Sequence, residues 1–237
     1  VKQETGMGRI GSRRPAALEI LKILNRGEYV KVEGTFSHFS SADGSEEYTR
    51  MQLGYFKELL CEAAAQGLKV GSAHISASSG FLNYKDACFD MVRLGHLAYG
   101  LEEGYKPVLS LKSKIVFIKD VREGAAISYG RTFKCARPSK IATIPLGYGD
   151  GFHRVLSNKA KVLIHGRPCP LIGNITMDML MADITELGDI PVGSEAVFIG
   201  RQGSGEITAA KVAAAAGTID YEVLTSITAR VPRKAED

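Results

Sequence analysis

The order of strand-like and helix-like segments constrains this chain most. Through the first hundred residues, segments typical of strands alternate with segments typical of helices. We expect helices at residues 14–25, 46–66 and 80–90, and strands at residues 28–39, 68–75 and 91–99 after a stub at 1–2. Because strands that alternate with helices form parallel sheets through right-handed crossovers, the first part is predicted to be an α/β unit.

The pattern changes near residue 106. From there, short β-type runs are separated by Gly, Pro and Asn, and they cover residues 108–120, 126–133, 140–146, 161–165, 177–184 and 196–199. Such runs favour a mostly antiparallel β domain, with one helix near residues 208–216 and another near 221–228. We therefore predict two domains, residues 1–105 and residues 106–237.

Three strands and a stub are too few to close a parallel barrel. Parallel sheets need both faces covered and their edges protected. The chain also starts at Val1 rather than Met, within a pattern that resembles the interior of a longer sequence. We predict an α/β plus β fold, in which the C-terminal half of a (β/α)8 barrel precedes the β domain, and we expect the chain to be a fragment.

Composition excludes several classes of function. The chain has 30 Lys and Arg against 26 Asp and Glu, and without a basic tract a net charge of +4 does not indicate a nucleic-acid partner. No apolar run approaches the roughly 18–20 residues of a membrane span, and no signal peptide is visible. The four cysteines lack CxxC or zinc spacing, so we expect no metal and buried or half-buried free thiols in a reducing cytosol.

Polar residues gather where the predicted barrel strands end, which is where barrel enzymes carry their sites. They are Lys2, Thr5, Arg9, His38, His74, Ser76, Ser78, Ser79, Arg93, Gly95 and His96. Each has an ordinary alternative, because serines commonly cap helices, lone histidines are commonly structural and buried arginines are commonly held in ion pairs. Backbone N–H groups at residues 78–80 would suit a phosphate or serve only as a capped helix start.

Seven motifs, taken together and in order, resemble those of the alanine racemases. They are TGMGRIG at 5–11, SHFSSAD at 37–43, RLG with YG at 93–100, ISYG at 127–130, IPLGYGDG at 144–151, MDM at 177–179, and YE with RVPR at 221–233. The resemblance covers the later two-thirds of such an enzyme. It implies a cytoplasmic, pyridoxal phosphate (PLP)-dependent interconversion of L- and D-alanine that supplies D-alanine for peptidoglycan.

The resemblance also implies catalytic roles. Racemisation needs a base on each face of Cα, and one base matches Tyr129, contributed across a homodimer with shared active sites and backed by His38 and Arg93. Arg93 would also face the pyridine nitrogen, where a cation disfavours protonation and weakens the electron sink. The other base is a Schiff-base lysine in a motif that this sequence lacks, so we expect the isolated chain to be inactive.

Further positions match cofactor and substrate contacts of the family. The cofactor contacts match Arg9, Ser78, Arg93, Gly95, His96 and Tyr221. The substrate contacts match Arg9, Met177 and Asp178. Lys2 matches a lysine that is often carbamylated, where the carbamate would orient Arg9 by a charge-assisted bond.

One departure from the family keeps alternatives open. Ala77 stands where an Asn usually contacts the phosphate. Serine racemases of the glycopeptide-resistance type also vary there, although Tyr221 favours alanine over serine. A barrel protein that binds PLP without racemising would lack the β domain. A non-catalytic remnant that serves as a dimerisation module would explain the missing lysine, but not the joint retention of Tyr129, His38 and Arg93.

Overall fold

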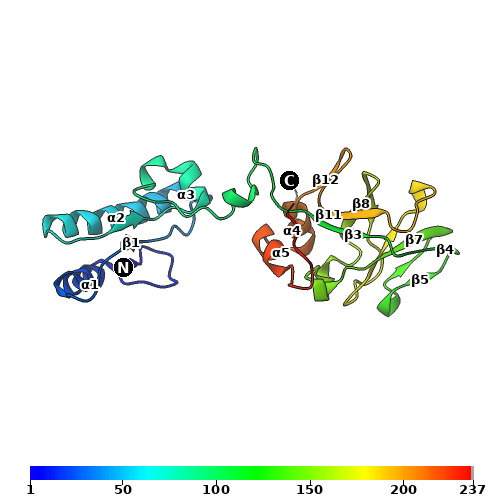
Figure 1. Cartoon of the computed structure of the whole chain (residues 1–237), viewed down its shortest axis with the longest axis horizontal. Helices are drawn as coiled ribbons and strands as arrows, with labels where there is room; N and C mark the ends of the chain where they lie inside the picture. Colours follow the sequence, from blue (N-terminus) through cyan, green and yellow to red (C-terminus); the bar gives the residue numbers. More distant parts are fainter. Residues whose placement is uncertain (236–237) are drawn as a thin grey trace. The chain divides into compact units, whose positions relative to one another are not determined.

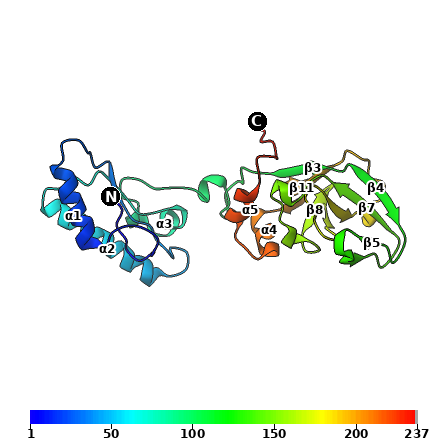
Figure 2. The same ribbon diagram turned by 90° about the horizontal axis from the view of Figure 1, so that it is seen from below.

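The structure is a computed structural model that describes residues 1–235. The chain forms two compact units, Val1–Ala98 and Tyr99–Asp237 (Figures 1 and 2). The boundary that we propose from the sequence pattern, between residues 105 and 106, lies inside the second unit.

The first unit combines helices with a small parallel sheet. Its elements are α1 (Arg14–Arg26), β1 (Gly34–Phe36), α2 (Glu46–Ala65), β2 (Ser72–His74), α3 (Ser78–Asn83), and the 3-10 turns η1 (Lys85–Ala87) and η2 (Leu97–Tyr99), the last of which runs into the second unit. Strands β1 and β2 are parallel, with Gly34 opposite Ser72 and Phe36 opposite His74. Lys2 forms a parallel bridge to Phe36, so the expected stub lies beside β1.

Local sequence explains where the two long helices begin and end. Pro15 lies in the first turn of α1, where its missing N–H costs nothing. The Ser45 hydroxyl caps α2 by accepting from the Tyr48 N–H, and Gly67 follows its end with a positive φ of 64°. Leu18 and Leu21 of α1 pack in one apolar cluster with Leu59 of α2, which joins the two helices.

Three expectations for the first unit are wrong in detail. Residues 28–33 lie outside β1 and are mostly exposed, so the strand expected at 28–39 shrinks to three residues. In the strand expected at 91–99, residues 91–96 form no strand. A strand needs a ladder of backbone hydrogen bonds to a neighbour, and this segment makes one such bond just beyond β2, from the Arg93 N–H to the Ser76 carbonyl. The helix expected at 80–90 is replaced by α3 and η1.

The second unit is built on antiparallel strands. They are β3 (Leu111–Lys114), β4 (Phe117–Val121), β5 (Ala126–Ile127), β6 (Phe133–Lys134), β7 (Ser139–Ile144), β8 (Lys161–Ile164), β9 (Arg167–Pro170), β10 (Leu180–Asp183), β11 (Glu195–Gln202) and β12 (Gly205–Ile207). Sheets run β12-β11-β8-β9 with β3 on β11, β10-β7-β4, and β5-β6. The antiparallel pairing expected from the short β runs is confirmed.

Helices and one large core complete the second unit. Helices α4 (Ala209–Ala216) and α5 (Asp220–Ser226) lie where helices were expected, and four 3-10 turns connect strands: η3 (Tyr129–Arg131), η4 (Tyr148–Asp150), η5 (Arg154–Leu156) and η6 (Thr185–Leu187). The core joins side chains of both larger sheets to those of α4 and α5. At its centre Phe152 meets Phe198 edge to face, with ring centroids 5.1 Å apart.

The four cysteines are all free thiols. Cys135 and Cys169 are buried and Cys88 is half-buried, as expected, but Cys61 is exposed on α2. Burial raises the pKa of Cys169 to about 11, so this thiol stays protonated and unreactive near neutral pH. Among the helices of residues 1–235, none has the length and apolar composition that a membrane crossing needs.

Candidate active site

The first unit holds a guanidinium at the ends of its two parallel strands. Arg93 Nη2 lies 3.0 Å from each of three acceptors, the carbonyls of Ser37 and Ile75 and the Nδ1 atom of His38. Arg93 Nη1 bonds to Nδ1 of His74. Ser37 and Ile75 directly follow β1 and β2, so the sheet itself places both carbonyls. The side chains of His38 and Arg93, predicted as partners, therefore meet in the structure.

All the partners of Arg93 are neutral. No carboxylate pairs with this guanidinium within the described residues, so the ion pair expected of a structural arginine is absent. A guanidinium can only donate, so Nδ1 of each histidine must accept and the ring proton must sit on Nε2. Burial, and then the charge of Arg93, lower the pKa of both His38 and His74. The arrangement holds a positive charge beside two neutral imidazoles.

An aromatic ring lies close to two cations in this cluster. The Phe36 ring stacks on His74, with centroids 5.0 Å apart and an interplanar angle of 15°. The guanidinium carbon of Arg93 and Nζ of Lys2 each lie 5.6 Å from the Phe36 centroid. Cation–π attraction therefore helps to hold both side chains near the strand ends.

The loop after the Lys2 stub brings further charge to the cluster. Burial, and then the charges of Arg9 and Arg93, lower the pKa of Lys2. Glu4 accepts a 2.5 Å hydrogen bond from the Gly6 N–H. Although burial opposes it, hydrogen bonding from the backbone N–H groups of the same loop lowers the pKa of Glu4. Lys2 and Arg9 thus act electrostatically on the cluster that contains Arg93. The carbamylation of Lys2 and the contacts of Arg9 to substrate and cofactor stay predictions.

A second polar cluster surrounds Ser78. Its buried hydroxyl oxygen accepts from the N–H groups of Gly95 (3.3 Å) and Leu97 (3.1 Å). Two backbone donors from one loop therefore converge on a single oxygen, the geometry that an anionic oxygen also uses. Ala77, the residue that departs from the family pattern, is the N-cap of α3 and makes no side-chain cap bond.

Tyr129 projects from a loop of the second unit. Its side chain is 74% exposed, and it lies in η3 between Ser128 and Gly130, which both have positive φ. Asn174 holds this turn, because its Nδ2 donates to the Tyr129 carbonyl (2.8 Å) and its own carbonyl accepts from the Ser128 hydroxyl (2.5 Å). The backbone is fixed while the phenol remains accessible.

Met177 and Asp178 occupy a neighbouring loop of the same unit. The Gly149 N–H donates to the Met177 carbonyl at 2.9 Å, and a Cβ added at Gly147 would collide with this carbonyl, so glycine is required there. Asp178 forms a 2.5 Å ion pair with Arg230. Met177 is half exposed, and so is Tyr221 at the start of α5.

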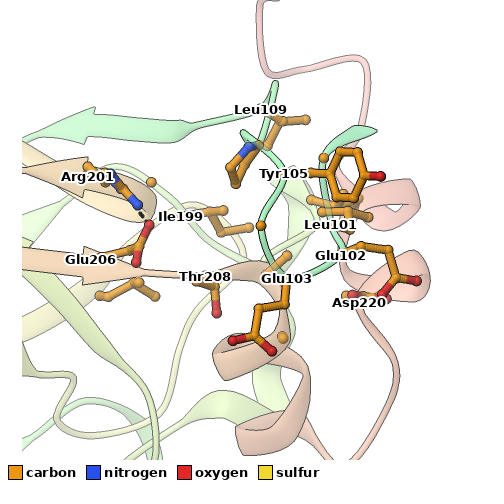
Figure 3. A pocket seen from close by; sticks show the side chains of 18 residues that line it. Leu101, Glu102, Glu103, Tyr105, Leu109, Ile199, Arg201, Glu206, Thr208 and Asp220 are labelled. Carbon is orange, nitrogen blue, oxygen red and sulfur yellow. Dashed lines mark hydrogen bonds and ion pairs between the residues drawn. The ribbon is translucent and has the colours of Figure 1, made fainter. Parts of the chain in front are cut away.

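A cavity of about 430 Å³ also lies in the second unit (Figure 3). Leu101, Leu109 and Ile199 give it an apolar wall, and the Arg201–Glu206 ion pair of 2.6 Å closes one side. None of the residues predicted for the site lines this cavity. Within residues 1–235 no His, Cys, Asp and Glu side chains are grouped to hold a metal ion.

Family models match both parts of the chain. Residues 1–103 match the alanine racemase N-terminal domain, and residues 108–235 match the alanine racemase C-terminal domain. The chain belongs to the alanine racemase family.

Similar proteins agree with this assignment. An alanine racemase of Halothermothrix orenii is 42% identical over 99% of this chain and 64% of its own length, and one of Symbiobacterium thermophilum is 41% identical over 98% and 64%. Among solved structures, the alanine racemase of Bacillus anthracis with bound L-Ala-P has a TM-score of 0.90 at 35% identity. That match covers 98% of this chain and 62% of that one. The chain thus spans about two-thirds of an alanine racemase.

The structure places the residues predicted for the site in two groups, one in each unit. Within the first unit His38 meets Arg93 and Ser78 meets Gly95, with His96 in the same loop. Tyr129, Met177, Asp178 and Tyr221 lie in the second. Sequence reasoning singled out His74 only as a strand end and did not expect its bond to Arg93. It also missed the buried amide of Gln52, whose signal was a long polar side chain on a largely apolar helix face.

Proposed function

We propose that the protein to which this chain belongs interconverts L- and D-alanine with the help of PLP. The observation that carries the proposal is the Arg93 guanidinium, held between His38 and His74 by neutral acceptors alone. An arginine that stays charged and has no carboxylate partner suits a site that binds an anion. It equally suits a site where a nearby ring nitrogen has to stay unprotonated. Such a site is compatible with PLP, which carries both a phosphate and a pyridine nitrogen.

The residues present fit the cofactor at two points. The convergent N–H groups of Gly95 and Leu97, with the Ser78 hydroxyl, would hold the phosphate. Arg93 would lie at the pyridine nitrogen. When bound, PLP supplies a sink for the electron pair left on Cα after a proton is removed. His96 and Tyr221 would contribute to phosphate binding, and Arg9 to cofactor and substrate carboxylate contacts.

Tyr129 is proposed as the base on one face of Cα. A tyrosine with a pKa near 10 is a poor base at neutral pH, so neighbouring donors must stabilise its phenolate. His38 carries its proton on Nε2 and can donate that hydrogen bond, while Arg93 keeps the imidazole neutral. Met177 and Asp178 would border the substrate. Lys2 is the candidate for carbamylation, beside Arg9.

Four wider features belong to the same proposal. The first unit would be the C-terminal half of a (β/α)8 barrel, and residues 106–237 would be the racemase β domain. The enzyme would be a homodimer in which Tyr129 serves the partner's site. It would act in the cytoplasm and supply D-alanine for peptidoglycan. The chain alone would be inactive, because the cofactor lysine of the family is absent from its sequence.

The test uses a full-length version of the protein, in which the N-terminal third of the Halothermothrix orenii relative precedes Val1. We expect this version, loaded with PLP, to racemise L-alanine as followed by circular dichroism. Tyr129→Phe removes one base and should lower kcat by about 10²–10⁴-fold in both directions. Because Tyr129 is 74% exposed, the thermal midpoint should hardly change. Full activity of Tyr129→Phe, or none in the parent, would contradict the proposal.

The shared site has its own test. A Tyr129→Phe subunit and an Arg93→Gln subunit each lack one half of the proposed site. If Tyr129 serves the partner's site, mixing the two variants under conditions that exchange subunits should restore part of the activity. Subunit exchange is monitored by mass spectrometry of differently labelled chains. Exchange without recovered activity would exclude a shared site.

A further inference from the structure

Helix α2 buries a glutamine in the face that packs on the strand ends. Gln52 is completely buried, next to Leu53 and close to Phe56, which belong to the apolar core of the first unit. A buried amide costs free energy unless its hydrogen-bonding atoms are paired. A leucine at this position would avoid that cost, so the hydrogen-bond partners of the amide should explain why a glutamine is present.

Both polar atoms of the Gln52 amide are paired twice. Nε2 donates to the hydroxyl oxygen of Thr5 (3.2 Å) and to the carbonyl of His38 (3.1 Å). Oε1 accepts from the N–H (3.0 Å) and from the hydroxyl (3.1 Å) of Ser40. One side chain thus uses its full set of planar donors and acceptors.

The partners lie in the two segments that carry the proposed chemistry. Thr5 precedes Arg9 in the loop after the Lys2 stub. The other partners are the backbone carbonyl of His38 itself and Ser40, two residues further along the chain. A 2.7 Å hydrogen bond between the hydroxyls of Thr5 and Ser37 closes the connection between these segments. On the other side, Arg93 holds the Ser37 carbonyl and the His38 ring.

We propose that Gln52 is a positioning residue. It fixes the His38 backbone relative to the loop that contains Thr5, so that the His38 ring stays hydrogen-bonded to Arg93. The proposal rests on the proposed function for its catalytic meaning, but the positioning itself concerns only this chain. Gln52 touches neither substrate nor cofactor in this account. It acts through His38 and through the loop that carries Arg9.

Thr49, one turn earlier on α2, provides a matched comparison. It is also completely buried, and its hydroxyl bonds to the carbonyls of Ser41 (3.0 Å) and Ser45 (2.7 Å). Thr49 therefore supports the same loop by buried hydrogen bonds, but it contacts neither His38 nor Thr5. A variant at Thr49 reports on loop stability alone.

The experiment measures the pKa of His38 by NMR in the chain, with the His38 signal assigned from His38→Gln. Gln52→Met removes both hydrogen-bonding atoms at similar volume, and Gln52→Glu keeps the acceptor but loses the donors. The charged groups that face His38 are Arg93, Arg9 and Lys2, and all of them lower its pKa. Release from burial and from Arg93 should raise the pKa of His38 by about 0.5 pH unit or more in Gln52→Met.

Gln52→Glu should raise the pKa of His38 further, because it adds a negative charge beside the His38 carbonyl. Thr49→Val should leave the pKa unchanged. In the full-length version, Gln52→Met should lower kcat/KM for alanine by about tenfold or more. The acid limb of the pH profile should move with the pKa of His38 measured in the same variant.

Three outcomes would overturn the proposal. They are an unchanged His38 pKa in folded Gln52→Met, an equal rise in Thr49→Val, and loss of cooperative unfolding in both Gln52 variants, which would make Gln52 a folding residue only. If the full-length version does not racemise alanine, the proposed function fails. The His38 titration still decides on Gln52 in that case, because it needs no activity.

Discussion

Polar side chains fill much of the interior of the first unit, whereas the interior of the second unit is almost wholly apolar. Of the fully buried polar side chains among the described residues, only Ser139 belongs to the second unit. The second unit instead contains the largest apolar cluster, built from two sheets and two helices. In the first unit, two imidazoles and two backbone carbonyls converge on Arg93, and two backbone N–H groups converge on Ser78. Hydrogen bonds therefore hold the predicted site residues of the first unit, whereas an apolar core supports the exposed loops that carry those of the second unit.

The largest expected effect tests the apolar side of this comparison. Phe198 is completely buried against Phe152 at the centre of the second unit. Phe198→Ala removes this packing and leaves a cavity, so it should lower the free energy of unfolding by about 3–5 kcal/mol. Phe117→Ala, at a half-exposed position, is the control and should change it by less than about 1 kcal/mol. Chemical denaturation followed by circular dichroism measures both, and equal losses would show that burial does not set the difference.

A smaller effect is expected when one hydroxyl is removed from the first unit. Thr5→Val removes the hydrogen-bond partner of the Ser37 hydroxyl and one of the two acceptors of Gln52 Nε2. Valine has nearly the shape of threonine, so the packing should be kept. The lost hydrogen bonds should nevertheless lower the free energy of unfolding by about 1–3 kcal/mol. Thr225→Val, on the exposed side of α5, is the matched control. A neutral Thr5→Val would mean that the polar interior contributes little to stability.

The same polar interior should make the first unit sensitive to acid. The folded pKa values of His38 and His74 are lowered by burial and by Arg93, so the unfolded chain binds protons more readily. Stability from this source is complete above about pH 6.5 and is lost as the pH falls through the lowered values. We expect amide hydrogen exchange between pH 7 and pH 5 to accelerate in residues 10–98 more than in residues 110–200. His38→Gln combined with His74→Gln should remove the difference, and uniform acceleration in the parent would exclude it.

The open edges of the parallel sheet lead to a related expectation at neutral pH. Strands β1 and β2 pair only with each other and with the bridge at Lys2, whereas the second unit has larger sheets. Residues 10–98 should therefore exchange faster than residues 110–200 even at pH 7. Equal protection would show that the buried hydrogen bonds compensate for the small sheet.

The smallest effect concerns specificity in the exposed loops of the second unit. Tyr221 is half exposed at the start of α5, so replacing it should alter chemistry more than stability. In the full-length version, Tyr221→Asn should make room for a hydroxymethyl group and shift kcat/KM towards serine by about 1–3 kcal/mol relative to alanine. The ratio of kcat/KM for L-serine and L-alanine in both proteins is the measurement. A parent that already prefers serine would favour the serine racemase alternative.

The sequence predicted the elements that local signals define. Helix α1 follows from Pro15 in its first turn, and α2 follows from a periodic apolar face that ends at Gly67. The short β runs predicted the antiparallel sheets. Residues 91–96 show where this reasoning stops: they have the apolar content of a strand, but a strand exists only where a neighbour supplies a ladder, and no local signal reports the neighbour.

The candidate site shows the same limit. His38 and Arg93 were predicted through the family resemblance, and their contact is seen in the structure. The role of His74 could not be derived, because its bond to Arg93 depends on how β2 lies beside β1. Gln52 is twelve or more residues from its partners in the sequence and bonds to them across the helix–sheet interface. Periodicity can flag such a residue as unusual, but only the fold identifies what it holds.

The turn that carries Tyr129 has a consequence for engineering the protein towards heat resistance. Ser128 has φ 63° and ψ −177°, a region that only glycine occupies without strain, and Arg131 also has positive φ. Each costs the folded state about 1–3 kcal/mol. A search for thermostable variants would therefore select glycine at these two positions. The selected proteins would gain stability by making the backbone around Tyr129, the proposed base, more flexible, so a screen by heat alone would not preserve the position of this side chain.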